Sequence, residues 1–196
     1  MSSSARFRAV TIQSRRERER AERHQLIIDA ARELAEAEGW DAVTTRRLAE
    51  KVEYSQPVLY SHFKNKDAII REVAIQGCGE LAEKLHEANA LQGKSRPHAV
   101  AEAYLEFARE RPALYDAMFV REVDIPFGTA DAPAELRAAF AELVAAVEPV
   151  AGDRDLETLT EVFWSTLHGI ATLTHGKRLR PSHHLDRLDL VLSQGR

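Results

Sequence analysis

The segment of the sequence that most restricts the fold comprises residues 44–67, with the sequence TTRRLAEKVEYSQPVLYSHFKNKD. Its apolar residues have the spacing of two short helices joined by a tight turn. Helices this short bury too little apolar surface to be stable alone, so a third helix has to cover them, and residues 25–38 supply it. This arrangement predicts a helix-turn-helix, in which the second short helix enters the major groove of DNA.

The residues at the expected helix ends support this interpretation. Thr44 and Ser55 can each accept a hydrogen bond from an unpaired backbone N–H at the start of helices 45–52 and 56–62. Pro57 falls in the first turn of the second helix, where its missing N–H costs nothing. Both helices therefore have start signals in the positions that the apolar spacing requires.

Two further residues mark the ends of the neighbouring helices. Gly39 follows the helical pattern of residues 25–38 and suits the left-handed conformation that ends a helix. Asn65 can cap another helix that begins at Lys66. The predicted head of the molecule thus extends over residues 15–65, after a flexible basic arm at residues 1–14.

Residues 26–70 resemble the DNA-binding domain of the tetracycline-repressor (TetR/AcrR) family. The similarity covers the stretches LIIDAARELAEAEGWDAVTTRRLAEKV and SQPVLYSHFKNKDAI, with the apolar spacing, the caps and Gly39 in register. The sequence departs from the family pattern at Glu53, where the turn usually carries a glycine. Either Glu53 adopts the turn conformation or the turn has a different geometry. The resemblance implies a transcriptional regulator, usually a repressor, that acts as a homodimer.

The candidate DNA contacts are polar and aromatic residues of the two short helices, the turn and the helix that follows. Glutamine can pair with adenine, and a proline or tyrosine ring can contact a thymine methyl group. Hydroxyl, histidine and lysine side chains can instead bind phosphate, and Lys66 at a helix N-terminus suits an anion. The candidates are Thr44, Thr45, Arg46, Tyr54, Gln56, Pro57, Tyr60, Ser61, His62 and Lys66.

The charge of the chain is unevenly distributed. The net charge is −4, yet residues 1–66 carry 13 lysine and arginine residues against 10 acidic ones, and the remaining residues carry 14 against 21. A basic end on an acidic body is expected where one end faces phosphate. The arginines in and directly after the N-terminal arm, at positions 6, 8, 15 and 16, either remain solvated or reach phosphates and the minor groove.

Residues 66–196 predict a helical ligand-binding and dimerisation domain, and the whole chain is expected to be all-α. Strand signals are almost absent, and Ala, Leu, Glu and Arg are abundant. The single cysteine, Cys78, excludes an intrachain disulfide and suits a reducing cytoplasm. No run approaches 18 apolar residues, so no membrane contact is expected. The expected helices are 67–91, 98–110, 112–118, 133–147, 155–175 and 184–192.

Gly77 and Gly79 interrupt the first of these helices, and each lowers helix stability by about 1 kcal/mol relative to alanine. They mark either close packing against a neighbouring helix or a flexible point between the head and the body. Both interpretations remain open from the sequence.

Aromatic and apolar residues with a few polar groups predict a cavity for a small amphipathic or aromatic ligand, although each of them could belong to an ordinary core. Residues 164–173, WSTLHGIATL, resemble the Trp-His-Gly type of C-terminal domain in one branch of the family. In that branch the segment lines the ligand cavity or the dimer interface. The candidate ligand contacts are Tyr104, Phe107, Tyr115, Met118, Phe119, Phe127, Phe163, Trp164, His168 and Thr172.

Several functional classes lack support in the sequence. There is no HExxH or CxxC pattern, no glycine-rich phosphate loop and no nucleophile elbow, so no metal, cofactor or catalysis is expected. The expected partners are a palindromic operator in double-stranded DNA, a small ligand and a second copy of the chain. The resemblance implies that residues 155–175 and 184–192 form the dimer interface. The alternative is an architectural DNA-binding dimer without a ligand.

Overall fold

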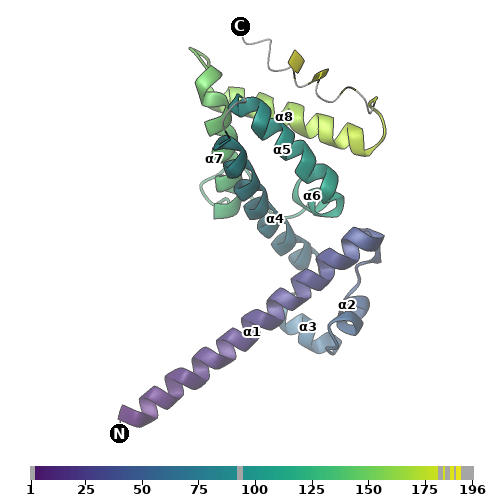
Figure 1. Ribbon diagram of the computed structural model, residues 1–196. Helices are drawn as coiled ribbons and strands as arrows, with labels where there is room; N and C mark the ends of the chain where they lie inside the picture. The colour runs from purple at the N-terminus through teal and green to yellow at the C-terminus, as the bar shows by residue number, and fades with distance from the viewer. Residues whose placement is uncertain (1–2, 92–94, 181–182, 184–185, 188, 191–196) are drawn as a thin grey trace. The chain divides into compact units, whose positions relative to one another are not determined.

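The structure is a computed structural model that describes residues 3–91, 95–180, 183, 186–187 and 189–190, with only the backbone for residues 3–12. The described residues form α-helices and two short 3-10 helices and contain no strand, which confirms the predicted all-α class (Figure 1). None of the described helices is both long and apolar enough to cross a membrane. The elements are α1 (Ser3–Glu38), η1 (Trp40–Ala42), α2 (Thr45–Lys51), α3 (Gln56–His62), α4 (Lys66–Asn89), α5 (Arg96–Glu110), α6 (Pro112–Phe119), α7 (Ala134–Val147), η2 (Glu148–Val150) and α8 (Leu156–His175).

The chain divides into two compact units, Met1–Glu72 and Val73–Arg196. The boundary lies inside α4 rather than at the predicted position before Lys66. The reason is that the first turns of α4 contribute the buried residues Ile69 and Ile70 to the N-terminal unit. Helix formation therefore continues across the boundary between the two units.

The N-terminal unit is built on α1, with α2 and α3 beside its C-terminal half (Figure 1). Apolar side chains one helical turn apart form a buried stripe on α1 and are covered by the short helices. This packing gives α2 and α3 the support that their length requires. The core residues include Ile27, Ile28, Ala31, Leu34, Val43, Leu48, Leu59 and Phe63, each at most 7% exposed.

Helix α1 is longer than the sequence analysis predicted. It is helical from Ser3 onward, so residues 3–14, which the sequence analysis assigned to a flexible arm, are part of this helix. Ion pairs and hydrogen bonds between residues four apart support the exposed part of the helix, including Arg15 with Glu19 at 2.8 Å and Gln13 with Glu17 at 3.2 Å. Such pairs each stabilise a helix by a few tenths of a kcal/mol.

The predicted caps of the head are confirmed at two of three positions. The Thr44 hydroxyl accepts from the Arg47 N–H at 3.2 Å, and Asn65 Oδ1 accepts from the Ala68 N–H at 2.9 Å. Ser55 occupies the N-cap position of α3, but its side chain makes no capping hydrogen bond, so that part of the prediction was wrong.

The ends of α1 and α2 depend on residues with positive φ. Gly39 ends α1 with φ 82° and ψ 162°, so φ is positive as predicted, although ψ lies outside the left-handed helical region. Glu53 has φ 58°, and the next N–H, that of Tyr54, donates to the Ala49 carbonyl at 3.0 Å. This bond is typical of a helix that ends in a left-handed residue. Glu53 therefore adopts the conformation that glycine usually supplies, at a cost of about 1 kcal/mol.

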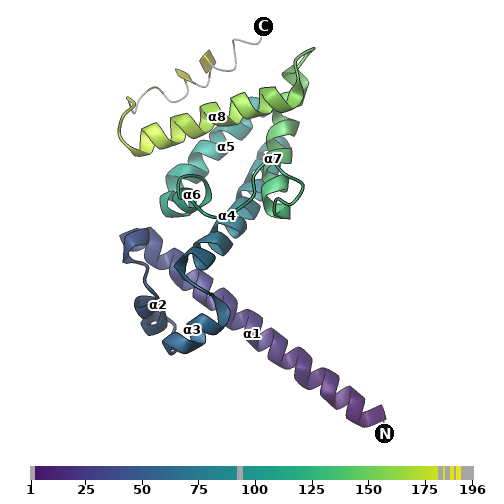
Figure 2. The ribbon, with the colours of Figure 1, turned by 180° about the vertical axis from the view of Figure 1, so that it is seen from behind.

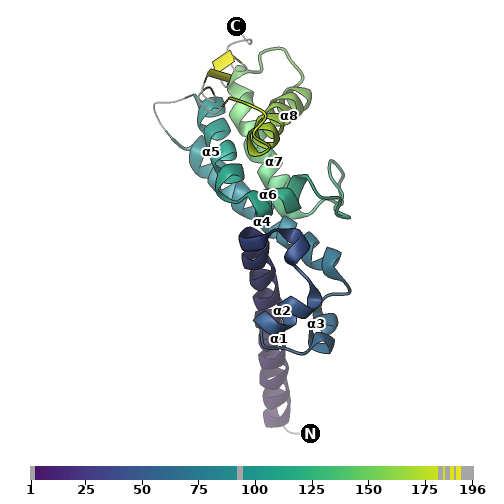
Figure 3. The same ribbon diagram turned by 90° about the vertical axis from the view of Figure 1, so that its right-hand side faces the viewer.

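The C-terminal unit contains most of α4 together with α5 to α8. Helices α5, α7 and α8 pack against one another, and α6 follows directly on α5 (Figures 2 and 3). The predicted helices agree with the observed ones to within a few residues up to His175. The predicted helix 184–192 lies partly outside the described residues. Large buried side chains of this unit include Leu81, Leu85, Tyr104, Phe107, Met118, Leu143 and Leu167.

The two glycines of α4 differ in their surroundings. A methyl group at Gly77 would lie 2.7 Å from both Leu114 Cδ1 and Met118 Sδ, which is too close without rearrangement. At Gly79 the nearest atom would be Glu135 Cγ at 3.4 Å, an ordinary contact. Close packing therefore explains the glycine at position 77, whereas nothing in the packing requires one at position 79.

Candidate DNA-binding surface and ligand pocket

Helix α3 presents one polar and aromatic face to solvent. Gln56, Pro57, Tyr60 and Ser61 are exposed and follow the i, i+1, i+4, i+5 spacing of a single helical face. The opposite face carries Leu59, which is 1% exposed and packs into the core. The Tyr60 ring is 52% exposed, which leaves it free to contact a base edge.

Four of the candidate contacts outside α3 are accessible, although one of them, Arg46, forms an ion pair within the head. Thr44 is exposed, and Thr45 and Tyr54 are half-buried. The Arg46 guanidinium donates to Glu50 at 2.9 Å, and both side chains are more than half exposed. An exposed ion pair of this kind contributes little to stability, so a phosphate group could compete for the arginine.

His62 lies differently from its neighbours on α3. It is half-buried, its ring centroid is 5.9 Å from that of His24 on α1, and among the described groups its Nδ1 has no partner although it is buried. Burial, followed by the nearby charges of Arg20, His24 and Arg23, lowers the pKa of His62. The ring therefore contributes to the packing of α3 on α1, which the sequence did not indicate.

Lys66 also has a partner within the head. Its Nζ donates to the backbone carbonyl of Trp40 at 2.5 Å, and the side chain is half-buried. This bond ties the start of α4 to η1 and competes with the predicted phosphate contact. Lys64, two residues earlier, is exposed and was not among the candidates.

Two arginines that the sequence analysis did not select support the position of the short helices. Arg47 forms a bidentate ion pair with Glu38, in which its two terminal guanidinium nitrogens lie 2.6 and 2.9 Å from the carboxylate oxygens. This pair lowers the pKa of the Glu38 carboxyl. Arg20 of α1 donates to the Ser61 carbonyl at 3.3 Å, close to the C-terminal end of α3. A cation at this end of a helix is favoured by the helix dipole.

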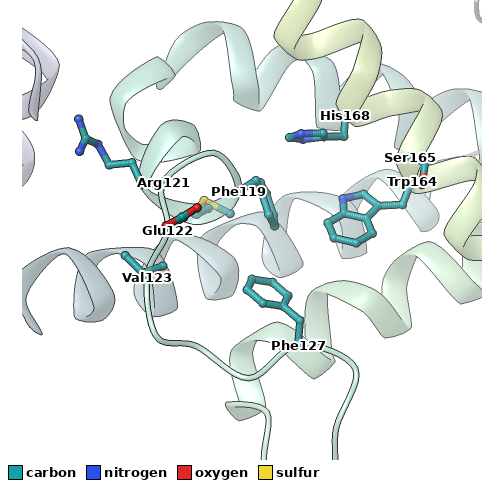
Figure 4. A pocket seen from close by; sticks show the side chains of 9 residues that line it. Phe119, Arg121, Glu122, Val123, Phe127, Trp164, Ser165 and His168 are labelled. Carbon is teal, nitrogen blue, oxygen red and sulfur yellow. The ribbon is translucent and has the colours of Figure 1, made fainter. Parts of the chain in front are cut away.

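The C-terminal unit contains a pocket of about 290 Å³ between α6, the loop that follows it and α8 (Figure 4). This volume is near the lower end of the range typical of small-molecule sites. The walls combine aromatic rings with a few polar groups. The lining residues are Met118, Phe119, Arg121, Glu122, Val123, Phe127, Trp164, Ser165 and His168.

The pocket contains part of the predicted ligand set. Met118, Phe119, Phe127, Trp164 and His168 line it, as the candidate set proposed. The remaining candidates do not line it, because their side chains are packed in the core behind it or bonded to their own helix. These are Tyr104, Phe107, Tyr115, Phe163 and Thr172.

The lining residues that were missed are Arg121, Glu122, Val123 and Ser165. The first three belong to a segment that the sequence identified only as a loop rich in helix breakers. Arg121 donates from Nε to Asp116 at 2.9 Å, which places a positive charge at the rim of the pocket. The two acidic side chains nearby, Asp116 and Glu122, make the rim mixed in charge.

A chain of hydrogen bonds runs from the core to the pocket. Trp164 Nε1 donates to the Tyr104 hydroxyl at 3.0 Å, and this hydroxyl lies 2.9 Å from that of Tyr115. The Tyr115 hydroxyl in turn lies 2.7 Å from His168 Nδ1. Burial raises the pKa of both tyrosines and lowers the pKa of His168, so all of these groups are neutral near pH 7.

The Phe119 ring packs against residues of this hydrogen-bond chain. Its ring makes edge contacts with Tyr115 at 5.2 Å and with Trp164 at 5.6 Å between centroids. Such edge-to-face pairs add about 0.5–1.5 kcal/mol each beyond the burial of area. The pocket is therefore a preformed aromatic site with fixed polar groups. Among the described residues, no group of His, Cys, Asp or Glu side chains could hold a metal ion.

Known families match both units of the chain. Residues 27–73 match the family described as bacterial regulatory proteins, tetR family, and residues 98–192 match the tetracyclin repressor-like C-terminal domain. An HTH-type transcriptional regulator of Mycobacterium tuberculosis is 31% identical over 153 residues, which cover 75% of this chain and 67% of that relative. A further HTH-type regulator, from Bacillus subtilis, is 33% identical over 101 residues, 51% of this chain and 53% of its own.

The match to a tetracycline repressor protein is short. The class D protein of Escherichia coli is 48% identical over 50 residues, which cover 26% of this chain and 23% of the repressor.

Solved structures share the fold. A protein of unknown function from Rhodococcus sp. RHA1 superimposes with a TM-score of 0.72 at 23% identity, over 88% of this chain and 92% of its own. A complex of SmeT with triclosan gives a TM-score of 0.54 at 18% identity, over 87% and 90% of the two chains. With the helix-turn-helix of α2 and α3, and with both units matched, the chain belongs to the TetR family of DNA-binding transcriptional regulators.

Proposed function

We propose that the protein is a ligand-responsive repressor, which binds a palindromic operator as a homodimer and leaves it when a small amphipathic or aromatic molecule occupies the pocket. The observation that carries this proposal is the double role of Met118. Its side chain lines the pocket, and its Sδ also lies against Gly77 of α4. Helix α4 begins at Lys66 in the DNA-binding unit and continues into the C-terminal unit. A ligand that displaces the Met118 side chain would therefore push on a helix that belongs to both units.

On the DNA side, the exposed face of α3 supports a role in reading base edges. Gln56 can pair with adenine, and Pro57 and Tyr60 can contact thymine methyl groups. Exposed basic residues nearby, including Lys64, are suited to phosphate. A single α3 covers too few base pairs to be selective, so two heads have to bind together, about 34–36 Å apart or at a related spacing.

Helix α8 offers a surface for the second copy. Val162 is 59% exposed and Leu173 is 40% exposed, and with Thr166 and Gly169 they follow the spacing of one helical face. A methyl group at Gly169 would meet no atom within 4 Å. A glycine with open space beside it allows another helix to approach closely, and exposed apolar residues on both sides of it favour an apolar partner. We therefore assign this face to the homodimer interface.

On the ligand side, the preformed aromatic pocket supports a small molecule with one apolar body and a few polar atoms. The triclosan complex of a protein with the same fold is consistent with such a ligand. For release to follow, the ligand has to bind the DNA-free conformation more tightly than the DNA-bound one. A ligand with equal affinity for both conformations would not change the equilibrium between them.

Selection from a pool of random double-stranded DNA with the purified protein tests this proposal. We expect one enriched palindrome whose half-sites are about one helical turn apart, or a multiple of it. Small molecules that raise the melting temperature of the protein are then added to the operator complex, and some of them should release the DNA. Enrichment without a sequence preference, together with no stabilising molecule, would favour an architectural dimer instead.

A further inference from the structure

The hydrogen-bond chain behind the pocket can be satisfied in only one direction. Trp164 Nε1 is always a donor, so the Tyr104 hydroxyl has to accept from it. Tyr104 is fully buried, and among the described residues the only other partner of its hydroxyl is that of Tyr115. The Tyr104 proton therefore points to Tyr115.

The same argument extends to the histidine. Since the Tyr115 oxygen accepts from Tyr104, its own proton is free to be donated to His168 Nδ1 at 2.7 Å. With a proton on Nδ1, the Tyr115 oxygen would have to accept from the ring, and one of the two buried tyrosine O–H groups would then lack an acceptor. An unsatisfied buried hydroxyl costs about 1–3 kcal/mol, so the forward direction is strongly preferred.

We propose that the Trp164–Tyr104–Tyr115 chain fixes His168 as a neutral ring with its proton on Nε2, and that the pocket thereby selects ligands that carry a hydrogen-bond acceptor at this point. The inference rests on the proposed function in one respect, namely that the pocket holds a ligand. It adds the chemical class: an apolar, mainly aromatic body with a carbonyl, ether, phenolate or carboxylate oxygen opposite Nε2.

The geometry of the pocket agrees with this polarity. His168 lines the pocket, and within the described part of the chain its Nε2 has no hydrogen-bond partner from the protein. Figure 4 shows His168 and Trp164 extending from α8 toward Phe119 and Phe127. The Nε2–H of His168 is thus the hydrogen-bond donor that remains for a ligand, while the surrounding aromatic rings supply apolar contact.

Histidine nitrogen NMR spectra of the wild-type protein test the first half of the proposal without any mutation. At pH 7 we expect His168 to show an unprotonated Nδ1 and a protonated Nε2. The signal is assigned by its loss in His168→Phe. A protonated Nδ1, or a doubly protonated ring, would overturn the inference.

A pair of probes of equal shape tests the second half. 2-Acetylnaphthalene carries a carbonyl acceptor, and 2-isopropenylnaphthalene has the same shape without the oxygen. We expect the ketone to bind about fivefold more tightly, the ratio that an ordinary net hydrogen bond gives, and to shift the Nε2 resonance. Equal affinity of the two probes would refute acceptor recognition. If neither probe binds, the ligand pocket itself is refuted, whereas the tautomer result stands independently.

A matched pair of core variants distinguishes an effect of the Trp164–Tyr104–Tyr115 hydrogen bonds from an effect of general core destabilisation. Tyr104→Phe removes the hydroxyl that orients Tyr115, so His168 should lose its single tautomer and the preference for the ketone should fall toward one. Phe107→Leu, one turn further along α5 and also buried, changes the same core without touching the chain. It should retain both the tautomer and the preference. A loss of preference in both variants would contradict a specific role of the chain.

Discussion

Gly77 of α4 lies so close to Met118 of α6 that an added methyl group would come within 2.7 Å of the methionine sulfur. Because Met118 also lines the pocket, this contact joins the pocket to the helix that begins in the DNA-binding unit. The glycine is therefore explained by packing, and the alternative interpretation of a flexible point is not needed at this position.

We expect Gly77→Ala to destabilise the protein and Gly79→Ala to stabilise it. At position 77 the methyl group meets buried atoms of Leu114 and Met118, and overpacking of this kind costs about 1–3 kcal/mol, more than the helix propensity that alanine restores. At position 79 the added contact is ordinary, so the gain of about 1 kcal/mol remains. Urea unfolding of the two single variants measures both effects. Equal stability of the two would contradict the packing explanation.

Gln56→Ala and Tyr60→Ala should weaken operator binding by about 1–3 kcal/mol each, because each removes an exposed side chain suited to a base edge. Gel-shift titrations at fixed salt measure the loss. Gln25→Ala, an exposed glutamine of α1 in the same unit, is the matched control and should bind as the wild type does. If both α3 variants retain full affinity, α3 does not read the operator through these residues.

The two lysines before and at the start of α4 should behave differently. Lys64→Ala should lower the salt dependence of DNA binding by about one unit per protomer, as expected for a lost phosphate contact. Lys66→Ala should instead lower the free energy of unfolding, because its ammonium group donates to the Trp40 carbonyl. Salt titrations and unfolding curves on both variants distinguish the roles. A reduced salt slope with unchanged stability in Lys66→Ala would restore the phosphate role predicted from the sequence.

Acidification should destabilise the fold through His62 and His168. Burial lowers the pKa of both rings below the usual 6.5, so the unfolded chain takes up their protons first as the pH falls. Their contribution is fully present above pH 6.5, declines below it and levels off once the pH is below the folded-state values. Unfolding free energies between pH 7.5 and 5 should decrease, and less steeply in His62→Gln. A slope unchanged by that substitution would exclude His62 as a contributor.

The double substitution Val162→Glu and Leu173→Glu should convert a dimer into monomers, because it places charges on the exposed apolar face of α8. Analytical ultracentrifugation measures the mass, and operator affinity should fall with it. Glu161→Lys changes an exposed charge on the neighbouring face and should leave the dimer intact. A double variant that remains dimeric would place the interface elsewhere.

Sequence information determined those features that depend on residues close together in the chain. The bounds of α3, the capping by Thr44 and Asn65 and the positive φ of Gly39 follow from rules that connect positions only a few residues apart. The early start of α1 was missed because a Ser- and Arg-rich segment is also compatible with a solvated tail, whereas in the structure the helix continues back to Ser3.

Only the tertiary structure decided which side chains meet across distant elements. Lys66 and Trp40 are far apart in sequence yet share a hydrogen bond, and no periodicity could distinguish that partner from a phosphate. Tyr104 and Phe119 are both aromatic residues on amphipathic helices, but one is buried in the core and the other lines the pocket. Local rules establish that such a side chain faces inward. Whether it meets other side chains or an open cavity depends on how several helices pack together, and this packing is set by shape and volume rather than by neighbours in the chain.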